Sequence, residues 1–213
     1  QGALLLYNYK GIFRDEEHVN SMPHIAGARP GDIIIEDYDN DGEITTDDRQ
    51  LFPLTTTPEI TFGLNLNFSY KNWELSALVQ GHGNAIRAIY DDKRSGTAGN
   101  YFQYDAEDRW TPENIDGTKP RAYQWLEEYW RNDHITDFNY ANVSYARLKN
   151  LQINYILPKP VIGIIGLESA KVYASGQNLW LIYSGNDIMD PEVSGMGAYP
   201  IMRVISVGAQ ISF

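Results

Sequence analysis

The chain has 213 residues, with 28 acidic and 17 basic side chains, a formal net charge of −11 and no cysteine. The lack of cysteine excludes disulfide scaffolds, zinc–thiolate sites and cysteine nucleophiles, and the lack of clustered Lys and Arg argues against nucleic acid as a partner. No apolar run approaches the roughly 18 residues of a membrane helix, a test that does not apply to membrane strands, which are shorter and only half apolar.

The first expected elements are a strand near 3–9 and a long connection over 10–58. That connection contains the segment DYDNDGEITTDD at 37–48, which follows the spacing of a calcium-binding loop. Calcium takes about 6–8 oxygen ligands, and a Gly at the sixth position of such a loop allows the sharp turn. The candidate ligands are Asp37, Asp39, Asp41, the backbone carbonyl of Glu43, and Asp48. The sequence therefore predicts a Ca²⁺ site, with an aspartate at the last position where glutamate is usual.

The alternative for this segment is a solvated acidic turn that holds no ion. The crowding of carboxylates favours a cation, because unscreened like charges at such short range repel one another. The preceding GDIIIE reads as extended, so no pair of flanking helices is expected. We therefore expect the ion to brace a loop, with weak extracellular-type affinity, and not to drive a helix-pair switch.

Five further segments alternate between apolar and polar residues, as strands with one apolar face do. They are 59–70, 73–83, 144–156, 169–178 and 203–213. These strands are longer than the usual 5–6 residues and match the roughly 9–11 of a membrane strand. Their polar faces are rich in Asn, Gln, Ser and Gly, which suits a wet lumen. The pattern predicts an all-β, antiparallel transmembrane β-barrel; the alternative is a soluble, secreted, calcium-stabilised β-sandwich that binds glycans.

The connections between the predicted strands alternate between short and long. Lys71 and Asn72 form a tight hairpin, 84–142 is a very long loop, 157–168 is shorter, and 181–202 is long again. Outer-membrane barrels have short periplasmic turns and long extracellular loops. Counting back from the last strand places the loops at 10–58, 84–142 and 181–202 outside the cell. About six strands do not close a transporter-sized barrel, so we expect a C-terminal piece of a longer polypeptide.

No group of residues predicts an enzyme. The four histidines do not share a metal-binding spacing. Asp187, Asp190 and Glu192 are the candidates from which a glycosidase carboxylate pair could come, but they lie in a loop rich in Asn, Gly and Pro.

Aromatic residues in the long second loop are candidates for stacking on sugar rings. The possible substrate-contacting residues are Tyr123, Trp125, Tyr129 and Trp130. The alternative is that they pack the loop against itself, and for Trp110 packing is the prediction.

A series of short motifs runs through most of the chain in a defined order. The motifs are Tyr9-Lys10-Gly11-Ile12-Phe13, Arg29-Pro30-Gly31-Asp32, Phe62-Gly63-Leu64-Asn65, Arg109-Trp110-Thr111-Pro112-Glu113-Asn114, Ser144-Tyr145-Ala146-Arg147-Leu148-Lys149-Asn150, Gln177-Asn178-Leu179, Asp190-Pro191-Glu192, Tyr199-Pro200 and the terminal Phe213. In this series the chain resembles the SusC/RagA-like TonB-dependent transporters of Bacteroidetes outer membranes.

The resemblance implies that residues 1–213 form the C-terminal part of a 22-stranded barrel whose N-terminal plug is absent from this chain. It also implies import of oligosaccharides or peptides across the outer membrane. The implied partners are a SusD-like surface lipoprotein, TonB acting through the missing N-terminal part, and the lipid of the outer membrane. The terminal Phe213 resembles the signal that the barrel-insertion machinery reads.

Overall fold

The computed structural model describes residues 4–89, 103–122, 136–195 and 197–213. The chain divides into two compact units, Gln1–Thr56 with Arg87–Ala141 and Thr57–Ile86 with Asn142–Phe213, and we describe each by itself. None of the helices within the described ranges is long and apolar enough to cross a membrane.

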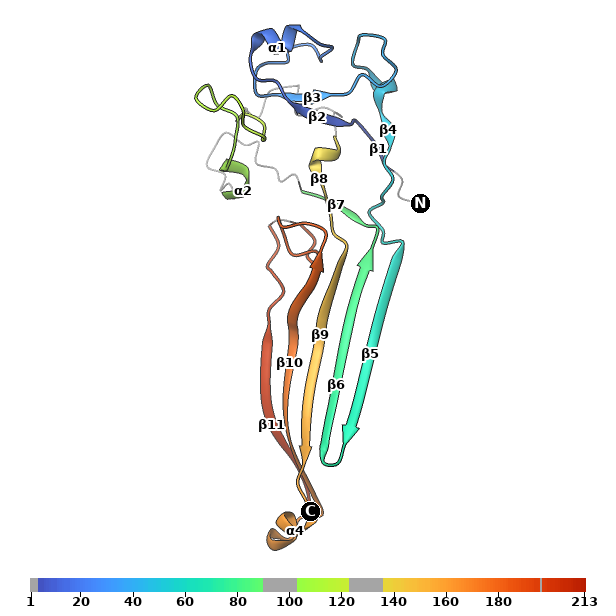
Figure 1. The fold of residues 1–213 in the computed structure, drawn as a ribbon, viewed down its shortest axis with the longest axis vertical. Helices are drawn as coiled ribbons and strands as arrows, with labels where there is room; N and C mark the ends of the chain where they lie inside the picture. The colour runs from blue at the N-terminus through green and yellow to red at the C-terminus, as the bar shows by residue number, and fades with distance from the viewer. Residues whose placement is uncertain (1–3, 90–102, 123–135, 196) are drawn as a thin grey trace. The chain divides into compact units, whose positions relative to one another are not determined.

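The second unit is built on one five-stranded antiparallel sheet with the order β11-β10-β9-β6-β5 (Figure 1). Its strands are β5 (Ile60–Tyr70), β6 (Trp73–Gly83), β9 (Tyr145–Ile156), β10 (Ser169–Ser184) and β11 (Val204–Ser212). Each strand pairs with its neighbour in sequence or with the next long strand, so the sheet is a simple meander. The five long strands predicted from the alternation are confirmed.

Two short turns join these strands at one end of the sheet. Lys71 turns the chain between β5 and β6 with a φ of 53°, and the side-chain amide of Asn72 donates to the Ile156 carbonyl at 2.8 Å. Helix α4 (Lys159–Ile162) and the 3₁₀ turn η3 (Gly163–Ile165) connect β9 to β10. Gly166 ends this turn in the left-handed region, with a φ of 73°, where glycine has no steric penalty.

Strand β10 is longer than the sequence indicated, because it continues past a β-bulge. The pairing of β10 with β9 shifts between Gln177 and Trp180 and again between Leu181 and Tyr183. Asn178, in the first shift, has a φ of 53°, which breaks the strict alternation from which strand ends are read. The strand expected at 169–178 therefore extends to Ser184.

The first unit contains two small antiparallel sheets. In one sheet β1 (Leu5–Leu6) pairs with β4 (Gln50–Leu51), and in the other β2 (Tyr9–Ile12) pairs with β3 (Ile33–Ile35). Helix α1 (Glu16–Asn20) and the 3₁₀ turn η1 (Thr46–Asp48) lie in the same segment, and α2 (Gln103–Ala106) and η2 (Asp137–Asn139) belong to the later part of the unit. The boundary between the units runs through the paired strands β7 (Ile86–Ala88) and β8 (Tyr140–Asn142).

The core of the first unit is formed by apolar residues on both faces of β3. Ile33 and Ile35 pack with Tyr7 and Ile12, whereas Ile34 points to the other face. On that other face Ile34 packs with Phe13 and Val19. An isoleucine run is buried on both sides here because successive side chains of a strand point in opposite directions.

The strand expected near 3–9 is not a strand of the large sheet. About six long strands were expected, and the described residues form five. Residues 5–6 and 9–12 form β1 and β2 instead, and both pair within the first unit. The apolar side chains Leu6 and Ile12 of these strands, and Tyr7 between them, are buried in that unit's core and not spread along one sheet face. Burial of the local side chains decides the pairing where alternation is weak.

Candidate functional site

Three of the five predicted calcium ligands come together in the Asp-rich loop. The carboxylate oxygens of Asp37, Asp39 and Asp48 all lie within 4.8 Å of one another. Asp48 is completely buried, with 0% of its surface exposed, whereas Asp39 is exposed. The three side chains occupy the first, third and last positions of the loop, which supply carboxylates in calcium loops of this spacing.

Backbone N–H groups hold these carboxylates in place. Asp48 accepts hydrogen bonds from the backbone of Tyr38 and of Thr45, each at 2.7 Å, and so closes the loop between its two ends. Thr45 also caps η1, with the reciprocal pair of hydrogen bonds of a capping box. Asp37 accepts from the backbone of Gly42 at 2.9 Å, where a φ of 89° favours glycine.

The other two predicted ligands are not part of the converging carboxylate group. Asp41 lies in the same turn, and its carboxylate accepts a 2.8 Å hydrogen bond from the backbone N–H of Glu43. Glu43 was predicted to contribute its backbone carbonyl, and its side chain is exposed.

The charges of this loop act on one another. The backbone N–H of Asp41 lowers the pKa of Asp39, but desolvation and the carboxylates of Asp41, Asp48 and Asp37 together raise it above the ordinary value of 3.8. A divalent cation among these oxygens would relieve that repulsion, so the residues present fit a hard, oxygen-binding ion.

A carboxylate just before the loop joins three strands of the first unit. Glu36 follows β3 and forms a 2.6 Å ion pair with Lys10 of β2. Its other oxygen accepts from the amides of Asn8 at 2.6 Å and of Gln50, on β4, at 3.0 Å. The hydrogen bond from Lys10, followed by that from Asn8, holds the pKa of Glu36 below its ordinary range. Strands β2, β3 and β4 are therefore tied together at the entrance of the loop.

Trp110 has a packing role, as predicted. Its indole Nε1–H donates to the Arg14 carbonyl at 3.0 Å, and its ring lies against Gly31. A Cβ atom at Gly31 would stand 2.5 Å from Trp110 Cε3, and Gly31 has a φ of 87°, so only glycine fits. The motifs around Gly31 and Trp110 thus form one packed joint.

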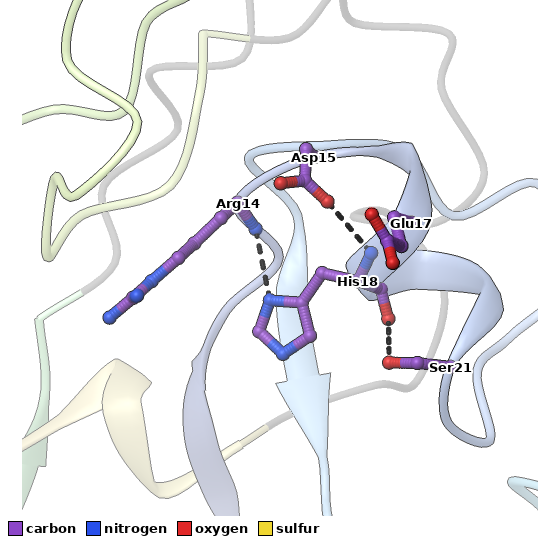
Figure 2. A pocket seen from close by; sticks show the side chains of 5 residues that line it. All are labelled: Arg14, Asp15, Glu17, His18 and Ser21. Atoms are coloured by element: carbon purple, nitrogen blue, oxygen red, sulfur yellow. Dashed lines mark hydrogen bonds between the residues drawn. The ribbon is translucent and has the colours of Figure 1, made fainter.

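A hollow beside α1 is lined by Arg14, Asp15, Glu17, His18 and Ser21 (Figure 2). Asp15 accepts from the His18 backbone at 2.8 Å, and the Ser21 hydroxyl donates to the His18 carbonyl at 2.8 Å. Nδ1 of His18 accepts from the backbone of Arg14 at 3.3 Å. The hydrogen bonds of Asp15 and Ser21 cap the two ends of a short helix.

One face of the large sheet is a continuous array of apolar side chains. Each row crosses the sheet through residues that pair directly. Three such rows are Phe68–Leu75–Ile153–Ala174–Val207, Leu66–Ala77–Leu151–Gly176–Ile205 and Tyr70–Trp73–Tyr155–Val172–Ala209. Many of these large side chains are exposed, among them Phe68 at 59% and Val207 at 80%. An exposed apolar surface of this extent marks an interface with lipid or protein.

The opposite face carries polar side chains in equally regular rows. Two of these rows are Ser69–Glu74–Asn154–Tyr173–Gly208 and Asn67–Ser76–Gln152–Ser175–Ser206. Glu74 accepts from the Asn154 amide at 3.1 Å, and Asn154 accepts from the Gln152 amide at 2.7 Å. These amides are paired with one another, as expected where a polar face is crowded.

A buried charge cluster lies on the polar face, and the sequence did not predict it. Arg147 of β9 forms ion pairs with Asp190 at 2.6 Å and with Glu192 at 2.8 Å, and Lys149 pairs with Glu192 at 2.9 Å. The Tyr145 hydroxyl donates to Glu192 at 2.7 Å. Two cations and two carboxylates thus neutralise one another, which gives Asp190 and Glu192 a structural role. Strict alternation with Leu151, Ile153 and Tyr155 would place Arg147 on the apolar face, and the register shift against β6 between Leu78 and Val79 moves it to the polar face.

The possible substrate-contacting aromatics Tyr123, Trp125, Tyr129 and Trp130 lie outside the described residues. Their stacking or packing role therefore stays a prediction.

No family model matches the chain. Two curated proteins of Formosa agariphila are similar to it over nearly its whole length. The protein named TonB-dependent receptor P3 is 29% identical over 228 residues, covering 100% of this chain, and TonB-dependent receptor P26 is 29% identical over 230 residues, covering 96%. The chain spans 22% of the length of each of these relatives.

Solved structures show the same fold. The chain matches one in the structure described as the RagAB peptide transporter with a TM-score of 0.67 and 21% identity, over 99% of this chain and 22% of that chain. It matches one in the RagAB peptide importer in the open-open state with a TM-score of 0.66 and 22% identity, over 99% and 22% of the two chains.

Proposed function

We infer the function from one premise, that the chain belongs to the SusC/RagA-like family of TonB-dependent transporters. We propose that it forms part of the wall of a 22-stranded outer-membrane barrel that imports oligosaccharides or peptides with energy from TonB. The structure described as a peptide importer makes peptides the first class to test. A SusD-like surface lipoprotein is the proposed partner at the outer mouth, and the plug and the contact with TonB belong to the rest of the polypeptide.

The observation that carries this proposal is the two-faced sheet. Strands β5, β6, β9, β10 and β11 have 9–16 residues, and one sheet face is apolar, with many of its large side chains exposed. A strand of about 9–11 residues crosses the apolar part of a bilayer when tilted. Polar residues on the other face would then line a hydrated lumen.

The edges of the sheet support closure by further strands. β5 and β11 are the outer strands of the sheet, and neither has a second neighbour within the described ranges. Unpaired strand edges do not persist in a bilayer, where each unsatisfied backbone group costs several kcal/mol. Strands from elsewhere in the full-length polypeptide are the proposed neighbours on both sides.

The same features weigh against the soluble β-sandwich. A sandwich buries the apolar face of a sheet beneath a second sheet, and no second large sheet is present in the part of the chain that the structure describes. The exposure of Phe62, Leu64 and Phe68 on β5 fits lipid better than water.

Uptake by whole cells tests the function. In the bacterium that carries the full-length gene, deletion of the gene should abolish uptake of one class of labelled substrate, oligopeptides or oligosaccharides. Deletion of tonB should have the same effect, whereas uptake of an unrelated sugar through a porin serves as the control. Uptake that persists without TonB would overturn the energy coupling. If deletion of the gene reduces uptake of neither oligopeptides nor oligosaccharides, the importer is overturned.

Membrane extraction tests the barrel separately. The full-length protein is expected in the detergent-extracted outer-membrane fraction, with heat-modifiable migration on gels. Recovery in a buffer-soluble fraction without such migration would favour the soluble sandwich.

We also propose that the Asp-rich loop holds a structural Ca²⁺. Asp37, Asp39 and Asp48 would supply carboxylate oxygens, with the backbone carbonyl of Glu43 and the side chain of Asp41 as further candidates. The buried carboxylate of Asp48 supports this proposal, because both of its oxygens are already held by backbone N–H groups. In an outward-facing loop the ion would stiffen the first unit and take no part in transport chemistry.

A further inference from the structure

The connection from β10 to β11 is held against the large sheet at several points. We call this connection, residues 185–203, the strap; the structure describes it except for residue 196. At its start the Gly185 backbone donates to the Ser144 carbonyl at 2.8 Å, and the Asn186 amide donates to the Asn142 carbonyl at 2.8 Å. At its end the Asn178 amide donates to the Met202 carbonyl at 3.0 Å.

The strap joins β10 to β11, but its middle contacts β9, on the other side of β10. Arg147 on β9 contacts both Asp190 and Glu192. Nε of Arg147 and the Glu192 oxygen are 2.8 Å apart, although the angle is not that of a hydrogen bond, so this contact is a close ion pair. Pro191, between the two acids, is among the fully buried side chains. The Asp190-Pro191-Glu192 segment is therefore seated on β9.

The register places this contact on the polar face of the sheet. Arg147 pairs with Gln80 and Tyr145 pairs with His82. Gln80 and His82 belong to the same side of β6 as Glu74 and Ser76, because side chains two residues apart share a face. The strap consequently covers the polar face, not the apolar one.

Burial makes the contact strong. The side chains of Arg147, Asp190 and Glu192 are 5%, 16% and 13% exposed. Removal of one member of such a cluster leaves an opposite charge buried without its partner, which is strongly destabilising. Salt screens buried pairs much less than surface pairs, so the cluster should hold at high ionic strength.

We propose that Arg147 is a positioning residue that fixes the strap as an immobile cover over the polar face, so that the strap permanently narrows the lumen and is not a moving gate. The narrowing rests on the proposed barrel, in which the polar face is the inner one. The fixation itself rests only on the contacts between β9 and the strap.

Hydrogen exchange on the full-length protein in detergent tests the fixation. Glu192→Gln keeps the side-chain shape and removes the charge, and Arg147→Gln removes the other partner. We expect each change to speed exchange in the peptides covering 187–203 by at least about tenfold, because the strap loses a buried ion pair that holds it to β9. A tenfold change corresponds to about 1.4 kcal/mol in the free energy of local opening. Peptides from β5 should exchange as in the parent, and heat-modifiable migration should show that the barrel is folded.

The double variant and a control make the result specific. Arg147 and Glu192 share one contact, although each also pairs with a second residue, so Arg147→Gln with Glu192→Gln should loosen the strap by less than the sum of the two single changes. Lys171→Met removes a cation from the polar face of β10 that has no ion pair among the described residues, and it should leave the strap unchanged. Unchanged exchange in both single variants, or additive effects in the double variant, would overturn the proposal.

Uptake distinguishes this inference from the proposed function. A parent protein without TonB-dependent uptake would refute the importer, whereas a strap loosened by Glu192→Gln would still support the fixation. A strap in the parent that already exchanges as fast as an unprotected loop would refute the fixation, whatever the uptake.

Discussion

The guanidinium of Arg121 lies 2.7 Å from the carboxylate of Asp32, and this contact joins two segments that are 89 residues apart. The backbone of Arg121 also donates to the Gly31 carbonyl at 2.8 Å. The side chains of Arg121 and Asp32 are 15% and 4% exposed, so the pair is largely shielded from water. It docks the segment that carries Trp110 onto the turn that leads into β3.

Loss of this pair should destabilise the first unit. We expect Arg121→Met to lower the opening free energy of the first unit by about 3 kcal/mol, because the buried carboxylate of Asp32 loses the charge of Arg121. Native-state hydrogen exchange at the Gly31 and Phe13 amides measures this quantity. The control is Arg14→Met, since the Arg14–Asp116 pair is 3.4 Å long and exposed, and a change within about 0.5 kcal/mol is expected. Equal effects of the two changes would contradict the prediction.

Two glycines with similar backbone angles should respond differently to alanine. Gly31 and Gly27 have φ values of 87° and 85°, but only a Cβ at Gly31 meets Trp110. Gly27→Ala should cost about 1–2 kcal/mol, the strain of a left-handed residue. Gly31→Ala should cost about 1–3 kcal/mol more, because the added methyl group displaces the indole. Thermal unfolding and the Trp fluorescence maximum measure the difference, and a cost no larger than that of Gly27→Ala would show that the joint is loose.

Calcium should bind the Asp-rich loop with a dissociation constant of about 10⁻⁴–10⁻³ M, the range of extracellular calcium modules. Calorimetry on the full-length protein in detergent measures the heats. Asp39→Asn should weaken binding by about tenfold or more, because a charged oxygen ligand is lost. Asp47→Asn, which lies outside the converging group, is the matched control. Weaker binding by Asp41→Ala would show that Asp41 is also a ligand. If the parent protein gives no heat of binding with calcium or magnesium, the prediction of a metal site is wrong.

Removal of calcium should matter more at neutral than at acidic pH. The folded-state pKa of Asp39 is raised above 3.8, so in the metal-free protein the folded loop binds a proton more readily than the unfolded chain. Its stability therefore falls as the pH rises from 3.8 through the raised pKa, and it is lowest above that window. A chelator should shift the melting temperature at pH 7 and have little effect near pH 4. The opposite order would contradict this account of the loop.

The contact between Glu36 and Lys10 should stabilise the first unit only while Glu36 is ionised. The pKa of Glu36 is lowered in the fold, so its contribution is present above the ordinary value of 4.5 and is lost as the pH falls through the lowered value. Glu36→Gln should therefore reduce stability at pH 7 and flatten the dependence on pH below 4.5. Glu43→Gln, an exposed change, should leave the slope as it is. Acid denaturation followed by hydrogen exchange compares the three proteins.

The alternation of side chains was sufficient to predict all five long strands. Apolar side chains such as Phe68 and Val207 recur at every second position, because successive side chains of a strand point to opposite faces of the sheet. The same reasoning failed for residues 3–9, because there the pattern is short and burial of Leu6 and Tyr7 in a local core determines the pairing. Burial depends on which segments meet, and a single window of sequence does not contain that information.

The acidic loop was predictable from its spacing, since Asp37, Asp39 and Asp48 belong to one short segment and turn toward one another within it. The ion pairs were not. Arg147 and Asp190 are 43 residues apart, and Arg121 and Asp32 are 89 apart, so neither local propensity nor periodicity relates them. The sequence alone determined where the five long strands lie, except for the far end of β10, which of their faces is apolar outside the register shifts, and where the acidic loop lies. Only the tertiary structure decided which loop is held to which strand, because a buried charge requires its partner in space and the chain allows that partner to come from any distance in sequence.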